Sequence, residues 1–183
     1  MKKDSLSVIC LDDFLDKDSL RGLQEKMLSV DYSVATNAEY GEDGKKEEKN
    51  KFHHGYEHQF AVDHFKDDLI LKKIKDEFFL HDDLKPVEIR AHLKHNTKEP
   101  HAHRDGKGDK EVWSFLLYVK GEQLLYNGTA FYGQDSKLNT YVGFQENRAL
   151  LFNSGKIYHT DLQALGQSSP RYSLNIFYKA PFE

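Results

Sequence analysis

The feature that most constrains the fold is a series of short segments, rich in aromatic and β-branched residues, that begins after Pro86. Polar and turn-forming residues separate these segments, and many short strands of this kind are typical of a β-sandwich or barrel. We therefore expect strands at residues 87–93, 112–119, 129–132, 141–144, 148–152 and 171–178.

The N-terminal part shows a different pattern. We expect a short strand at residues 7–11, a helix from Asp16 or Asp18 to about Ser29, and a second helix over residues 65–79, where apolar residues recur at helical spacing. Charged residues and glycine dominate residues 41–51, GEDGKKEEKNK, and predict a loop. The sequence predicts an α+β, mainly β, single domain over 1–183, in which a helical part (1–85) backs a β core (86–183).

Charge and hydropathy argue against two classes of partner. The net charge is −4 and no basic stripe is present, so nucleic acid is not an expected partner. The longest apolar run, residues 115–119, is far shorter than the ~20 residues that span a bilayer, and we expect neither a membrane anchor nor a secretion signal. Cys10 has no second cysteine to pair with, which favours a reducing, cytoplasmic setting.

One pattern among the ten histidines is informative: His-x-Asp, then a distant His, then an Arg. A chain of this composition contains about 1.6 His-x-acid pairs by chance, and three His-x-Asp pairs begin at His81, His103 and His159. Only His103 and Asp105 lie between two predicted strands with a later histidine and arginine. A pairing of His101 with His103 would provide no carboxylate.

His103, Asp105 and His159 together have the donor set of a non-haem Fe(II) centre. Two imidazoles and one carboxylate bind one face of the metal and leave the opposite positions open. Side chains at i and i+2 of an extended segment point the same way, and the third ligand must come from another strand. The sequence therefore predicts a metal site at these three residues.

Arg171 and Ser173 begin the last predicted strand and should project from the same face of it. A guanidinium beside a hydroxyl makes a charge-assisted binding site for a carboxylate. An arginine at a strand start also forms surface ion pairs, but its place after the complete triad favours the binding interpretation.

Residues 86–178, roughly half of the chain, resemble the 2-oxoglutarate and Fe(II)-dependent oxygenases, and look closest to the small prolyl-hydroxylase-like branch. The segments that carry the resemblance, in order, are HRD (103–105), WSFLLY (113–118), NGTAFY (127–132), RALLFN (148–153), His159 and RYS (171–173).

The resemblance implies a double-stranded β-helix, or jelly-roll, core. It also implies Fe(II) at His103, Asp105 and His159, and 2-oxoglutarate with its far carboxylate on Arg171 and Ser173. Such an enzyme is a dioxygenase that uses O2 to hydroxylate an aliphatic C–H, with succinate and CO2 as coproducts.

Two positions depart from the pattern of relatives. His92 stands where many of them carry a tyrosine that reaches the cosubstrate, and Phe177 stands where the nucleic-acid demethylases carry a second arginine. The likeness therefore favours a prolyl peptide or an amino acid as substrate, and nothing in the sequence indicates an oligomeric state. Asp161 either orients a ligand imidazole or is a solvated loop residue, and the second interpretation is preferred.

Two alternatives belong to other functional classes. A cupin-like metalloprotein would use His103, Asp105 and His159 without a keto acid, so Arg171 would be dispensable. A non-catalytic binding module on the same fold would show no selective Fe(II) binding.

Overall fold

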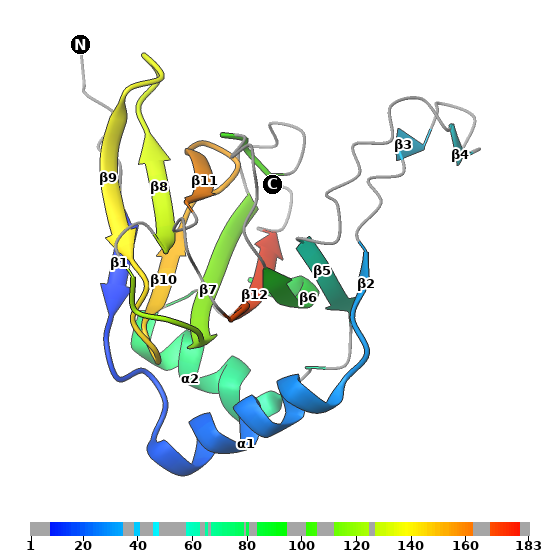
Figure 1. Cartoon of the computed structure of the whole chain (residues 1–183). Helices are drawn as coiled ribbons and strands as arrows, with labels where there is room; N and C mark the ends of the chain where they lie inside the picture. Colours follow the sequence, from blue (N-terminus) through cyan, green and yellow to red (C-terminus); the bar gives the residue numbers. More distant parts are fainter. Residues whose placement is uncertain are drawn as a thin grey trace.

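The structure of the chain is a computed structural model. It describes residues 8–34, 39–40, 46–47, 58–62, 65, 67–78, 80, 84–94, 102–105, 112–124, 127–162 and 169–179. A large and a small antiparallel sheet face each other, and two helices cover the outer side of the large sheet (Figure 1). This is the expected mainly β architecture of a jelly roll backed by N-terminal helices.

The large sheet has seven strands in the order β1-β10-β7-β12-β6-β5-β2. β12, the last strand of the chain, lies between β6 and β7, so residues that begin and end the β core become neighbours. Strands from the first 85 residues extend the sheet at both edges. The bounds are Val8–Leu11 (β1), Ser33–Val34 (β2), His58–Val62 (β5), Lys85–Lys94 (β6), Val112–Lys120 (β7), Ala149–Phe152 (β10) and Arg171–Lys179 (β12).

The small sheet has three strands in the order β11-β8-β9. Their bounds are Gly128–Tyr132 (β8), Leu138–Gly143 (β9) and Tyr158–Leu162 (β11). A separate pair joins Glu39–Tyr40 (β3) to Lys46–Glu47 (β4). β4 lies within residues 41–51, where the sequence predicted only a loop.

Both helices begin at aspartate caps. Asp16 accepts hydrogen bonds from the backbone N–H groups of Asp18 and Ser19 and so begins α1, Lys17–Ser29. Asp67 accepts from the backbone N–H groups of Leu69 and Ile70 at the start of α2, Asp68–Phe78. A carboxylate at this position satisfies N–H groups that have no partner within the helix and favours the positive end of its dipole.

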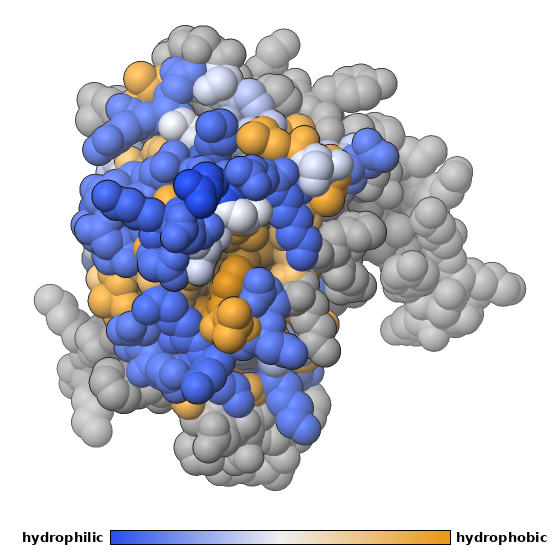
Figure 2. Space-filling view, turned by 90° about the horizontal axis from the view of Figure 1, so that it is seen from below, coloured by the Kyte–Doolittle hydropathy of each residue, from blue (hydrophilic) through white to orange (hydrophobic). Residues whose placement is uncertain are grey.

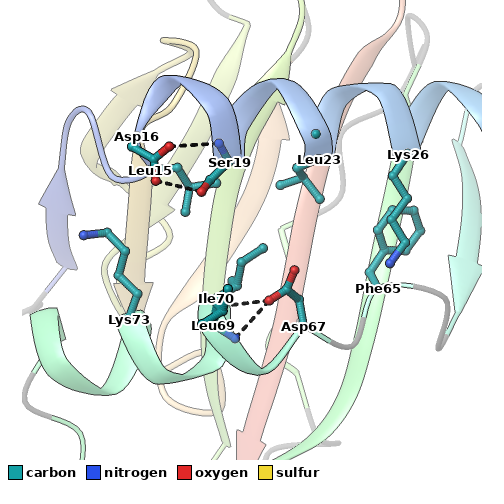
Figure 3. Close-up of a pocket in the computed structure, with 11 residues that line it drawn as sticks. Leu15, Asp16, Ser19, Leu23, Lys26, Phe65, Asp67, Leu69, Ile70 and Lys73 are labelled. Carbon is teal, nitrogen blue, oxygen red and sulfur yellow. Dashed lines mark hydrogen bonds between the residues drawn. The ribbon is translucent and has the colours of Figure 1, made fainter.

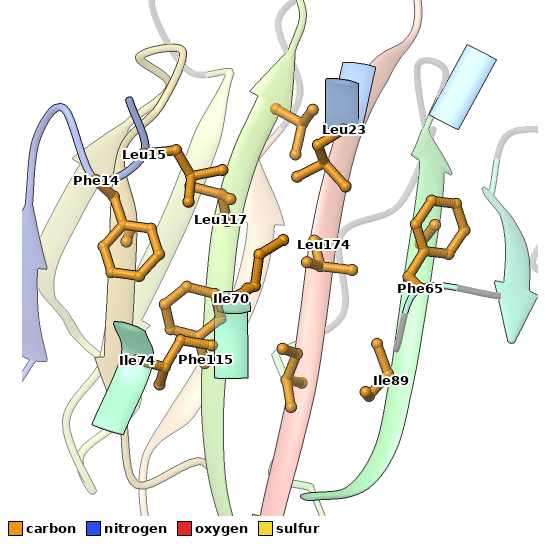
Figure 4. Close-up of a cluster of buried hydrophobic side chains, with 14 of the residues drawn as sticks. Phe14, Leu15, Leu23, Phe65, Ile70, Ile74, Ile89, Phe115, Leu117 and Leu174 are labelled. Carbon is orange, nitrogen blue, oxygen red and sulfur yellow. The ribbon is translucent and has the colours of Figure 1, made fainter. Parts of the chain in front are cut away.

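The main hydrophobic core lies between the helices and the large sheet (Figure 4). Side chains of the helical part, among them Leu23 and Ile74, meet every second residue of the central strands. Phe115 of β7 is fully buried there, with its ring centroid 5.3 Å from that of Phe14 and 5.8 Å from that of Phe78. The strand residues on this face are Ile89, Ala91, Phe115, Leu117, Val119, Ala149, Leu151, Leu174, Ile176 and Tyr178.

A smaller core lies between the two sheets. Its buried members are Leu116, Tyr118, Phe131, Phe144, Leu150, Phe152 and Ile157. Tyr118 is fully buried, and its hydroxyl lies 2.8 Å from the Thr129 hydroxyl across the interface. Desolvation raises the pKa of Tyr118 to about 12, so the phenol remains neutral over a wide pH range.

Asn147 joins the N-terminal segment to the core. Its side chain accepts from the backbone N–H of Leu15 at 2.8 Å and donates to the Leu15 carbonyl at 2.7 Å. Asn147 has a φ of 67°, a conformation that asparagine tolerates better than most residues. Next to it, Arg148 makes a bidentate ion pair with Asp12. These contacts hold the entry to α1 against the turn before β10.

Most of the predicted elements are confirmed with shifted ends. The helices expected to end at about Ser29 and at 79 are α1 and α2, and the first of them begins after Asp16 rather than Asp18. Strands β2, β3, β5 and β11 were also not predicted. The strand expected at 141–144 is β9, which begins at Leu138.

The helix-covered face of the molecule is largely hydrophilic, with hydrophobic side chains exposed between the charged ones (Figure 2). Leu69 is the most exposed of the large hydrophobic residues in the described part of the chain, at 80%. A hollow of about 430 Å³ lies beside it between α1 and α2, with Leu23, Phe65 and Ile70 in its lining (Figure 3). Within the described ranges, no helix is long and apolar enough to cross a membrane.

Candidate active site

His103, Asp105 and His159 come together beside β11. Each offers one ligand atom, and these atoms all lie within 4.8 Å of one another. Nε2 of His103 lies 3.6 Å from one Asp105 carboxylate oxygen, and Nε2 of His159 lies 3.6 Å from the other. Two imidazoles and a carboxylate around one point fit a divalent metal with open positions.

Backbone pairing fixes the two histidines against each other. The N–H of His103 donates to the carbonyl of His159 and the N–H of His159 donates to the carbonyl of His103, both at 2.9 Å. This isolated antiparallel bridge places residue 103 beside β11, although the two are far apart in sequence. The imidazole centroids are 4.6 Å apart as a result.

Hydroxyl groups hold the Asp105 carboxylate in place. Oγ of Ser114 on β7 lies 2.9 Å from Asp105 Oδ2 and 2.6 Å from Oγ of Ser154. The Ser114 hydroxyl has a single proton, which it can donate either to the Asp105 carboxylate or to the Ser154 oxygen. The backbone N–H of Asp105 also donates to the Ser154 carbonyl. These contacts orient a ligand through its neighbours, as is common around protein metal sites.

The surroundings of His159 favour its neutral form. Its Nδ1 lies 3.1 Å from the Ile157 carbonyl oxygen, which can only accept, so the proton lies on Nδ1 and the Nε2 lone pair faces Asp105. Burial lowers the pKa of His159 to about 4, with Asp105 acting in the opposite direction. The imidazole therefore stays neutral near pH 7, the form that binds a metal.

One side of the cluster of His103, Asp105 and His159 is open. The side chain of His103 is 57% exposed, whereas those of Asp105 and His159 are 17% and 11% exposed. The neighbouring Arg104 guanidinium lies over the Tyr158 ring at 4.7 Å. A small molecule can therefore approach the site from the His103 side.

Arg171 is fully buried on the same inner face, further along the barrel. One terminal nitrogen donates to Asp161 Oδ1 at 2.8 Å and the other to the Gly128 carbonyl at 3.2 Å. The guanidinium also lies 5.5 Å from the Tyr118 ring centroid. Gly128 must be glycine here, because a Cβ would collide with the Val142 carbonyl oxygen on β9.

Lys94 lies directly opposite Arg171 in the β6–β12 pairing, and its ammonium contacts the Asp161 carboxylate. Burial lowers the pKa of Lys94 well below its ordinary value, and Arg171 acts in the same direction, whereas Asp105 raises it. Asp161 is thus an ion-pair partner on a strand. The interpretation of it as a solvated loop residue was therefore wrong, and a role in orienting a ligand imidazole stays a prediction.

Ser173 and His92 also face each other across β12 and β6. Both are buried, and Ser173 shares the inner face with Arg171, as predicted from strand alternation. His81 and His101, the alternatives considered from sequence, lie outside the described residues.

Sequence reasoning missed Lys94, Ser114 and Ser154. Lys94 follows Arg90 and His92 in an alternating polar row, but it lies one residue beyond the strand predicted at 87–93, and its position opposite Arg171 depends on strand order. No local signal marks the two serines, because their role depends on a contact between segments 40 residues apart.

The fold matches solved structures over nearly its whole length. One is a prolyl-4-hydroxylase from Pseudomonas putida (16% identity, TM-score 0.61, 97% of this chain and 95% of that one). The chain has the fold of the 2-oxoglutarate and Fe(II) oxygenases.

Two further matches point the same way. HygX from Streptomyces hygroscopicus, solved with nickel and 2-oxoglutarate bound, matches at 10% identity and a TM-score of 0.68, over 98% of this chain and 85% of that one. A prolyl hydroxylase from Trichoplax adhaerens, in complex with a hypoxia inducible factor peptide fragment, matches at 12% identity and a TM-score of 0.64, over 96% and 84%. No protein-family model and no curated protein matches the sequence.

Proposed function

We propose that this chain is an Fe(II)- and 2-oxoglutarate-dependent dioxygenase that hydroxylates an aliphatic C–H, with a prolyl peptide or an amino acid as substrate. The observation that carries the proposal is the convergence of His103, Asp105 and His159 on one point, in a barrel that also buries Arg171. The fold alone does not determine a function, so the argument depends on these side chains.

The spacing of the two groups suits a short diacid. Asp161, which contacts Arg171, is two residues beyond His159 on β11. Two strand residues advance about 7 Å, so a carboxylate at Arg171 and a chelating group at the metal ligands could belong to one small molecule. Arg171 and Ser173 would hold its far carboxylate, and His103, Asp105 and His159 would hold the iron.

The chain's own residues would bind the metal, orient the side chains that hold it and shield the site from water. Bound iron and 2-oxoglutarate would supply the oxidising chemistry, with succinate and CO2 as coproducts. His159 offers a neutral Nε2 because Ile157 fixes its tautomer, and Ser114 fixes the direction of the Asp105 carboxylate. Phe152, whose ring packs at 4.9 Å from that of His159, excludes water from the inner side of the ligands. Substrate would approach from the exposed His103 side.

The test is an anaerobic titration with Fe(II) and then 2-oxoglutarate, followed by visible absorption. We expect the charge-transfer band of a chelated keto acid, and His103→Ala or His159→Ala should remove it. Asp105→Asn, which removes the ligand carboxylate, should also weaken the band. Asp135→Asn, at an exposed carboxylate in the turn between β8 and β9, is its matched control and should leave the band unchanged.

Arg171→Ala tests the carboxylate-binding role separately. The loss of a charged hydrogen bond should weaken 2-oxoglutarate binding about 10- to 100-fold while iron still binds. Arg21→Ala, at an exposed ion pair on α1, is the matched control. Iron binding without the band would favour the cupin-like metalloprotein, and no iron binding would favour the non-catalytic module.

A further inference from the structure

Asn175 on β12 has a buried amide oxygen without a donor. No hydrogen-bond partner for its Oδ1 exists in the part of the chain that the structure describes. Leu174 and Ile176 on either side face the helices, so the Asn175 side chain points to the inner face of the large sheet. A buried acceptor without a donor destabilises a fold. An apolar side chain of similar size would avoid this loss, so packing alone does not explain the asparagine.

Strand pairing places Asn175 near the metal-ligand cluster. It lies directly opposite Leu116 of β7, and Ser114 is two residues away on the same face of β7. Diagonal neighbours of this kind are about 7–8 Å apart. Ser114 in turn contacts the Asp105 carboxylate. A substrate bound beside Asp105 could therefore also contact the Asn175 amide.

The side chains around Asn175 form a polar patch in which the charges are paired. Arg90, directly opposite on β6, makes a bidentate ion pair with Glu88 and lies 5.3 Å from the centroid of the Phe177 ring. The side chains of Arg90 and Glu88 are 32% and 33% exposed, so solvent reaches this end of the inner face. The patch therefore suits a neutral polar ligand.

A carboxamide recognises a group that both donates and accepts hydrogen bonds. Rotation about the terminal torsion of asparagine is broad and roughly two-fold, so Oδ1 can turn toward the open end of the inner face. A peptide group offers the matching N–H and C=O without a charge. A free amino acid would bring an ammonium and a carboxylate, whose desolvation this patch would not offset.

We propose that Asn175 binds a backbone amide of a peptidyl substrate, with Oδ1 accepting from the peptide N–H and Phe177 packing beside it. This inference rests on the proposed function and chooses between its two substrate classes, the prolyl peptide and the amino acid. It makes Asn175 a specificity-determining residue.

The test measures binding without turnover. The full chain is loaded anaerobically with Mn(II) and 2-oxoglutarate, and probes are titrated by NMR, because Mn(II) accelerates the relaxation of probe protons that bind near it. The probes are N-acetyl-L-proline methylamide, its dimethylamide, which lacks the N–H, and free L-proline. The methylamide should bind about tenfold more tightly than either of the other two.

Asn175→Leu removes the amide and keeps a side chain of similar size. It should bind the methylamide about tenfold more weakly and leave dimethylamide binding unchanged, so that the preference between these two probes disappears. Because Oδ1 has no partner, the variant should unfold at a temperature at least as high as the unsubstituted chain. Asn139→Leu, at an exposed asparagine on β9, is the matched control and should change none of these values.

The remaining outcomes separate the two proposals. Equal binding of methylamide and dimethylamide, tighter binding of L-proline, or no relaxation effect on any probe would overturn the inference and leave the proposed function standing. A lower unfolding temperature of Asn175→Leu, with equal weakening for both amides, would assign Asn175 to the fold and would also overturn it. If the unsubstituted chain binds neither Mn(II) nor 2-oxoglutarate, the proposed function itself fails.

Discussion

On β12, the side chains of Leu174, Ile176 and Tyr178 face the helices, whereas those of Arg171 and Ser173 face the small sheet. Both sets are buried. The helix side contains interlocking apolar groups whose burial stabilises the fold. The inner side contains charges and hydroxyls that satisfy each other only through contacts made across the two sheets.

The two faces of this sheet therefore differ in role. Alternate residues of one strand either pack in the apolar core, which stabilises the fold, or face the candidate active site. A strand's successive side chains point to opposite faces, so a shift of register by one residue would exchange the two sets completely. The large apolar core therefore fixes not only the fold but also which residues reach the candidate active site.

The largest effect on the free energy of unfolding should come from removing a large side chain from the apolar face of the sheet. Phe115→Ala removes a fully buried ring that packs between Phe14 and Phe78, and should lower the free energy of unfolding by about 3–5 kcal/mol. Urea unfolding measures this loss. Leu138→Ala, at a side chain 56% exposed, is the control. The metal affinity of the folded variant should be unchanged, and a parallel fall would contradict the separation of the two faces.

An intermediate effect on the free energy of unfolding should come from Tyr118, on the inner face, at alkaline pH. Tyr118 ionises at about 12 in the folded chain and at about 10 when unfolded. The stability that its neutral form contributes is therefore present below pH 10 and is lost between pH 10 and 12, up to about 3 kcal/mol.

Tyr118→Phe should be slightly less stable near neutral pH, because it loses the hydrogen bond with Thr129, but should lose less stability between pH 10 and 12. Urea unfolding at pH 8, 10 and 11 measures the difference. The exposed Tyr158→Phe should follow the unsubstituted chain. Identical slopes for Tyr118→Phe and the unsubstituted chain would show that this phenol is not desolvated.

The smallest effect on the fold should come from Ser114→Ala, on the strand position next to Phe115. Loss of the hydroxyl that holds Asp105 should weaken divalent metal binding about 10- to 100-fold, while the free energy of unfolding changes by about 1 kcal/mol. Metal titration and urea unfolding are measured on the same preparation, with Ser29→Ala at an exposed helix end as control. A stability loss as large as that of Phe115→Ala would contradict the comparison.

The sequence predicted the elements whose residues repeat a local pattern. α1 and α2 follow from apolar spacing and aspartate caps, and β7 and β12 follow from aromatic and β-branched runs. β11 was missed because its sequence, YHTDL, uses the inward positions for His159 and Asp161 and so lacks an apolar alternation.

Only those residues of the candidate site could be predicted whose chemical type and order along the chain identify them. His103, Asp105 and His159 could be selected because their donor chemistry is specific, and the structure brings them together. Lys94 could not be selected from the sequence, because its proximity to Arg171 depends on β12 lying beside β6. That adjacency joins two distant segments and leaves no trace in the local pattern of either.

The contact between Leu15 and Asn147 spans 132 residues, and β1 forms its ladder with β10 over a similar distance. During synthesis the first strand is therefore made long before its partner exists. At about 5–20 residues per second, a ribosome needs roughly 7–30 s to supply that partner. For that interval Val8–Leu11 is an unpaired apolar strand of a nascent chain. Such a segment is open to chaperones and to pairing with other chains, so the yield of folded protein should depend on how translation speed compares with capture of this strand.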